Sequence, residues 1–75
     1  MSTAAPQPQR VSRKRAWRAL MIEGPQAAKD GKTGADCPYN PNGGPAERVL
    51  ARMWVRGFAR ARNVLAKQDR ATQAD

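Results

Sequence analysis

The sequence predicts a small all-α protein, a hairpin-like pair of helices joined by a long loop. Two stretches carry apolar residues at the spacing of an amphipathic helix, and a segment rich in Gly, Pro and Asn separates them. The chain has 75 residues, which allows one small domain with a limited core. Much of its 40% hydrophobic content is alanine, which favours helix but buries little surface. An enzyme pocket enclosed by the protein's own core is therefore not expected.

The two ends of the chain predict tails. Residues 1–9 carry no charged side chain and no periodicity, and we expect them to be disordered. A single small helical domain is expected over residues 10–70, followed by a frayed tail over residues 71–75.

The first helix is predicted to begin after Ser12, a favourable N-cap residue, and to end at Gly31. Pro25 has no backbone N–H and its ring clashes with the carbonyl of Met21, so this helix should be kinked or split at Gly24-Pro25. One face is predicted to pack against the second helix, and it comprises Trp17, Leu20, Met21, Gly24, Ala27 or Ala28, and Gly31.

A loop is predicted from Lys32 to Gly44, and a second helix from Pro45 to about Lys67. The apolar face of the second helix is Leu50, Met53, Trp54, Gly57, Phe58, Ala61 and Leu65. We expect Leu50, Trp54 and Phe58 to pack against Trp17, Leu20 and Met21, with Cys37 and Tyr39 covering the pair. Close approach of the two helices is assigned to Gly24, Gly31 and Gly57.

The charge of the chain predicts a polyanionic partner. Its net charge is +8, and most of its 14 basic residues are arginine, whose planar fork grips phosphate. The candidate RNA-binding residues form two groups, one on each helix: Arg13, Lys14, Arg15 and Arg18, then Arg48, Arg52, Arg56 and Arg60.

Other classes of site are not expected. The single cysteine leaves no partner within the chain for a disulfide, and without histidine a zinc site would lack ligands. No apolar run reaches the ~18 residues that a membrane span needs. We expect a cytoplasmic protein that uses no metal or other cofactor, enters no membrane and takes no small-molecule substrate.

An ordered set of residues runs through the middle of the chain: Gly24, Ala27 and Gly31, then Cys37-Pro38-Tyr39, then Trp54, Gly57-Phe58 and Ala61. This set resembles the ribosome modulation factor family, small basic bacterial proteins that silence ribosomes in stationary phase. The chain departs from the family in two places. Pro25 stands where an aromatic residue is common, and the segment from Cys37 to Trp54 is longer than usual.

The resemblance implies a ribosome hibernation factor that docks on the small ribosomal subunit, near the 3′ end of its RNA and the ribosomal proteins there. It further implies that the protein blocks messenger engagement and promotes inactive ribosome dimers. The residues that would hold the scaffold for this task are Trp17, Leu20, Met21, Gly24, Gly31, Cys37, Pro38, Tyr39, Trp54, Gly57 and Phe58.

Two other interpretations stay open. One is a nucleic-acid-binding accessory protein, of phage or cellular origin, on the same scaffold. The other is a small ATP-dependent drug-modifying enzyme. Against it, Gln26 stands where a phosphate-binding loop that ends in Gly31-Lys32-Thr33 needs its first glycine. The sequence also offers no catalytic base or metal cluster, so we expect no enzymatic activity.

Overall fold

The computed structural model describes residues 11–73 of the chain, with side chains described up to residue 70. In this part of the chain every regular element is a helix, which confirms the predicted all-α class. The predicted disordered tail at residues 1–9 lies outside the described residues, as do residues 74–75. The elements in chain order are α1 (Arg13–Arg18), η1 (Ala19–Glu23), α2 (Gly24–Lys29), η2 (Gly34–Asp36) and α3 (Pro45–Gln73), the last of which runs beyond the predicted end at Lys67.

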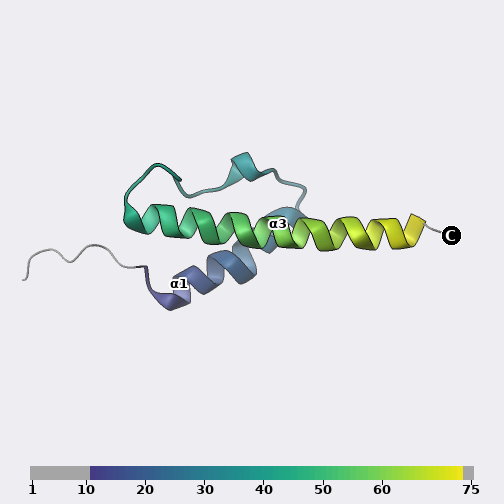
Figure 1. Cartoon of the computed structure of the whole chain (residues 1–75), viewed down its shortest axis with the longest axis horizontal. Coiled ribbons are helices and arrows are strands. Elements are labelled where there is room, and N and C mark those ends of the chain that lie inside the picture. The colour runs from purple at the N-terminus through teal and green to yellow at the C-terminus, as the bar shows by residue number, and fades with distance from the viewer. Residues whose placement is uncertain (1–10, 74–75) are drawn as a thin grey trace, which may run out of the picture.

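The first three elements join into one bent helix, called the N-terminal helix below (Figure 1). Its middle, η1, is a π-helical turn in which the N–H of Gly24 donates to the carbonyl of Ala19, five residues back. The next donor in that register would be Pro25, which has no N–H. The wider turn therefore carries the chain past Pro25 without ending the helix. The predicted disruption at Gly24-Pro25 is confirmed as a bend, not a break.

Both ends of the N-terminal helix are capped by the predicted residues. The Ser12 hydroxyl accepts a hydrogen bond from the N–H of Arg15 at 3.1 Å. At the other end Gly31 adopts a φ of 75°, and the N–H of Lys32 donates to the carbonyl of Ala27 at 3.0 Å. A Cβ on Gly31 would meet nothing within 4 Å, so the predicted role of Gly31 in close helix approach is wrong. Its role is the left-handed turn that ends the helix.

Two glycines mark the point where the N-terminal helix crosses α3. A Cβ on Gly24 would overlap the carbonyl oxygen of Trp54 and lie 2.8 Å from the nitrogen of Phe58. A Cβ on Gly57 would overlap the carbonyl oxygen of Leu20. The two backbones are therefore in contact, and only glycine fits at either position. The predicted close approach is confirmed for Gly24 and Gly57.

The core surrounds this crossing and consists of Ala19, Ala27, Leu50, Trp54 and Phe58. Trp54 is 2% exposed, and its ring stacks on that of Phe58 with centroids 5.1 Å apart and planes at 7°. Large side chains thus come from α3 and small ones from the N-terminal helix. Partly buried residues packed against the cluster are Val11, Ala28, Cys37, Tyr39 and Met53.

The prediction that Trp17 and Met21 pack into the core is wrong. Trp17 is 53% exposed and Met21 is 49% exposed. The cause is the π turn, which places about one extra residue between Ala19 and Gly24 compared with an α-helix. Upstream of the turn, the inward face is shifted back by one residue, so Ala19 packs in the core with the large residues of α3 and Ala16 is half-buried.

The N-terminal helix and α3 run in the same direction (Figure 1). Near the crossing Leu20 lies beside Gly57, and further along both helices Lys29 shares a groove with Leu65. In a helical hairpin the two helices run in opposite directions. Here they run in the same direction, so the chain has to return past α3 before α3 can begin. The return from Leu65 to Pro45 is about 30 Å at 1.5 Å per residue. Residues 30–44 can span roughly 50 Å when extended, so the long loop is what the topology requires.

We predict that Gly57→Ala destabilises the protein by about 1–3 kcal/mol, because the new methyl group must separate two backbones that are in contact. The higher helix propensity of alanine, worth about 1 kcal/mol, acts in the opposite direction and is too small to compensate. Urea unfolding followed by circular dichroism measures the difference. Gly34→Ala is the matched control, since a Cβ there meets nothing within 4 Å. Equal stability of the two variants would contradict the crossing geometry.

We also predict that Trp54→Ala costs roughly 3–5 kcal/mol of stability, because it leaves a cavity beneath Phe58. Trp17→Ala removes the same side chain from an exposed position and should leave the thermal melt close to that of the wild type. A similar loss in both variants would place Trp17 in the core after all.

Candidate nucleic-acid interface

The eight basic residues predicted to bind RNA are all exposed. They do not lie on one surface. The structure distributes them over two basic grooves and the rim of a third, apolar groove. The first basic groove is lined by Lys14, Arg15 and Arg18, and the second by Arg48, Arg52 and Arg56. Arg60 lines the apolar groove, and Arg13 lines none of the three.

The first basic groove lies on the N-terminal helix. It has a volume of about 440 Å³ and is lined by Ser12, Lys14, Arg15, Arg18, Glu23 and Tyr39. The α1 helix places Lys14 and Arg18 four residues apart, on neighbouring turns of one side. Basic residues in the first turn oppose the helix dipole, so the Ser12 cap has to hold this end in place.

A single acidic side chain fixes the far wall of this groove. The Tyr39 hydroxyl donates a hydrogen bond to Oε1 of Glu23, which ties the Cys37-Pro38-Tyr39 segment to the N-terminal helix. Burial raises the pKa of the Tyr39 hydroxyl, and the hydrogen bond and charge of Glu23 raise it further, while Arg15 acts in the opposite direction. Sequence reasoning missed this pair, although a lone carboxylate in a basic helix is a usable signal for such a partner.

The second basic groove runs along the first half of α3. It has a volume of about 350 Å³, and Pro41, Arg48, Ala51, Arg52, Val55 and Arg56 line it. Buried Ala51 leaves room between the longer side chains. The three arginines follow one another at steps of about 6 Å along the helix axis. The arrangement is a cationic track with an apolar floor, which can follow a phosphate backbone.

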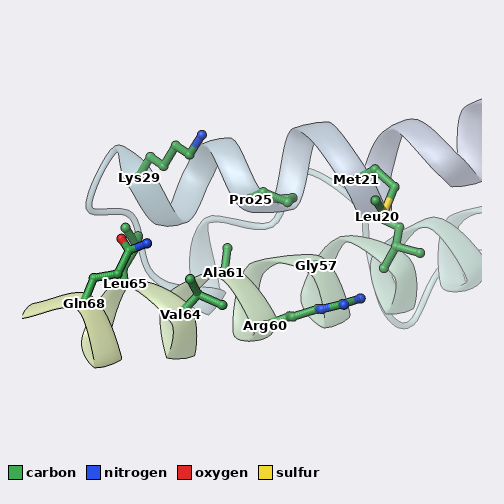
Figure 2. Close-up of a pocket in the computed structure, with 10 residues that line it drawn as sticks. All are labelled: Leu20, Met21, Pro25, Lys29, Gly57, Arg60, Ala61, Val64, Leu65 and Gln68. Atoms are coloured by element: carbon green, nitrogen blue, oxygen red, sulfur yellow. The ribbon is translucent and has the colours of Figure 1, made fainter. Parts of the chain in front are cut away.

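Arg60 leaves this track. A step of four residues turns a helix by about 40° beyond a full turn, so Arg60 is rotated by roughly 120° from Arg48. It lies instead at the apolar groove between α3 and the N-terminal helix, whose volume is about 310 Å³ (Figure 2). The other residues that line this groove are Leu20, Met21, Pro25, Lys29, Gly57, Ala61, Val64, Leu65 and Gln68. The predicted arginine stripe is therefore divided: Arg48, Arg52 and Arg56 line the second basic groove, and Arg60 lines the apolar groove.

The Tyr39 segment connects the two basic grooves. Tyr39 lines the first groove and Pro41, two residues later, lines the second. Two residues span at most about 7 Å, so the near edges of the grooves are neighbours. Between Tyr39 and Pro41 the loop is held to α3, because the N–H of Asn40 donates to Oε2 of Glu47 at 2.8 Å. Glu23 and Glu47 thus fix the segment between the grooves to one helix each.

Two other predicted residues, Cys37 and Pro38, lie next to the core. Cys37 is half-buried and packs against the core cluster, and Pro38 lines a shallow groove over Trp54. Within the described residues there is no group of three or more His, Cys, Asp or Glu side chains that could hold a metal ion. In the same part of the chain, no helix combines the length and the apolar character that crossing a membrane demands.

The Ribosome modulation factor family matches residues 8–71 of this chain. Because the match covers most of the 75 residues, the chain belongs to the ribosome modulation factor family, a family of ribosome-associated factors. No curated protein and no solved structure matches the chain.

The raised pKa of Tyr39 predicts a pH-dependent contribution to stability. A folded-state pKa above the unfolded value of about 10 means that the hydroxyl stabilises the fold below pH 10. This contribution is lost as the pH rises through the folded-state pKa. We therefore expect the stability difference between the wild type and Tyr39→Phe to be constant from neutral pH to about pH 9 and to shrink above pH 10. Urea unfolding at a series of pH values measures it, and a difference that grows at high pH would contradict the assignment.

Proposed function

We propose that this member of the family docks on the RNA of the small ribosomal subunit through its two basic grooves, and that it thereby silences translation. The family assignment supports a ribosomal partner. The resemblance of the sequence to the family favours a site near the 3′ end of that RNA, where the bound protein blocks messenger engagement.

The observation that carries the proposal is the adjacency of the two basic grooves across Tyr39 and Pro41. Lys14, Arg15 and Arg18 neutralise phosphates of one RNA segment. Arg48, Arg52 and Arg56 neutralise those of another segment. The glycine crossing fixes the angle between the two helices, so the protein selects RNA that is folded to match this angle.

The apolar core supports this function without touching RNA. Trp54 and Phe58 stack on each other inside the protein and are buried, so they hold the geometry and are not available to bases. Shape selection by a rigid cationic wedge needs no catalytic group, and the proposed mechanism uses none.

We predict that Arg48→Gln, Arg52→Gln and Arg56→Gln together weaken binding to small subunits by more than about tenfold at moderate salt, because three phosphate contacts are lost. The slope of log affinity against log salt should become shallower by about two to three, at 0.7 to 0.9 per contact. Glutamine favours helix, and all three positions are exposed, so the fold should persist. Sedimentation with purified small subunits, at low and moderate salt, measures both quantities.

A charge-matched variant separates the groove from general attraction. Arg62→Gln, Lys67→Gln and Arg70→Gln together lower the net charge of +8 by the same three units, from exposed positions in the second half of α3. This control should keep most of the wild-type affinity. Equal losses in the two triple variants would mean that net charge, and not the second basic groove, drives binding. A wild-type protein that does not sediment with small subunits would refute the proposed function.

A further inference from the structure

The position of Trp17 is unexpected for a protein with so small a core. The five buried residues of the core cluster include only three large ones, yet Trp17 remains 53% exposed. On the inner side of the same helix stand alanines, Ala16 and Ala19. An α-helical register through this region would have turned Trp17 toward α3, and the π turn turns it outward. The fold therefore leaves more than half of the Trp17 side chain exposed on the surface.

The surroundings of Trp17 on the helix are cationic. Arg13 and Lys14 lie four and three residues before it, so their Cβ atoms are about 5–6 Å from that of Trp17. Helical side chains lean toward the N-terminus, which places the indole over the turn that carries these two residues. Arg18 follows directly, and no acidic residue occurs within five positions on either side. An exposed aromatic face among cations is the arrangement with which proteins hold single-stranded nucleic acid.

No other aromatic residue of the chain is free for this task. The chain has four: two Trp, one Tyr and one Phe. Trp54 and Phe58 are buried and stacked on each other. Tyr39 is partly buried, and its hydroxyl donates to Glu23. Among the four aromatic residues, Trp17 alone is more than half exposed.

The positive charge around Trp17 also limits which partners can bind over its side chain. A second copy of this chain carries the same charge of +8 and would be repelled from the cationic turn. A partner has to bring negative charge together with a flat apolar face. An unpaired nucleotide brings both, since its phosphates lie beside a base that stacks on an aromatic ring.

We propose that Trp17 is a base-stacking residue, on which an unpaired base of the RNA rests while Arg13, Lys14 and Arg18 hold the adjoining phosphates. This inference rests on the proposed function and narrows it, because it makes single-stranded RNA the target of the N-terminal helix. The duplex or folded part of the RNA is left to the arginine track on α3. Stacking is tolerant of base identity, so Trp17 contributes affinity for unpaired RNA and little sequence preference.

The test compares the wild type with Trp17→Ala on three probes: a short single-stranded RNA without self-pairing, the same strand paired with its complement, and inorganic polyphosphate. We expect Trp17→Ala to weaken binding to the single strand by about 5- to 150-fold, the range for one stacked base. Affinity for the duplex and for polyphosphate should be unchanged. The salt slope should also be unchanged, because no phosphate contact is lost.

Two further variants test whether the loss of binding is specific to the aromatic ring at position 17. Ile22→Ala removes another apolar side chain of the N-terminal helix, 47% exposed, and should leave all three affinities at the wild-type level. Trp17→Phe keeps an aromatic ring and should retain most of the affinity for the single strand. It also leaves buried Trp54 as the sole tryptophan, so RNA should quench the fluorescence of the wild type and not that of Trp17→Phe.

Each contrary outcome is distinct. Unchanged binding of Trp17→Ala to the single strand, in a wild-type background that binds RNA, overturns the stacking assignment alone. An equal loss on all three probes overturns it as well, since Trp17 would then support the fold or the charge. Polyglutamate serves as a fourth probe, and a dependence on Trp17 for binding polyglutamate and not RNA would replace the base with an acidic protein partner. Failure of the wild type to bind any RNA overturns the proposed function itself.

Discussion

The structure depends on the contact between two backbones at Gly24 and Gly57. A Cβ at either glycine would overlap a carbonyl oxygen of the opposite helix, so neither position accepts a side chain. The carbonyl that faces Gly57 belongs to Leu20, at the π turn where the next donor in register would be Pro25. The crossing and the irregularity in the N-terminal helix therefore lie at the same place. Close contact of the backbones compensates for the small residues of the N-terminal helix, since large side chains from one helix are enough to surround the crossing.

The crossing also determines where the basic residues can go. Because the two helices run in the same direction, the chain must return along α3 through residues 30–44. Tyr39 and Pro41 of this return segment each line a basic groove, and Glu23 and Glu47 attach it to the two helices. The loop is thus more than a connection. Two of the acidic residues in a strongly basic chain are used to hold it, and they keep it between the grooves.

Features that depend on local chemistry could be predicted from the sequence. The Ser12 cap, the bend at Pro25, the left-handed stop at Gly31 and the start at Pro45 each follow from one residue and its neighbours. The errors arose where one residue changes a register. A π turn shifts the inward face by a single position, which moved Trp17 and Met21 to the surface. The pairing of Tyr39 with Glu23, 16 residues apart, and the apolar groove at which Arg60 lies require the fold itself. The composition and the Cys-Pro-Tyr pattern indicated the family, but not the two grooves.

The distribution of charge links binding to stability. A net charge of +8 on 75 residues repels itself and disfavours the compact state. The described part of the chain buries no polar or charged residue, so all of its basic side chains remain in solvent, on the outside of a small core. A polyanion that enters the two grooves neutralises this repulsion and binds the folded state in preference to the unfolded one, which stabilises the fold by mass action. The crossing glycines, with no side chain to add to the core, and the outward Trp17 both reduce what the isolated chain can bury. The same features shape the surface that the RNA of our proposal would cover, and binding there would add to the stability of a protein with this little core.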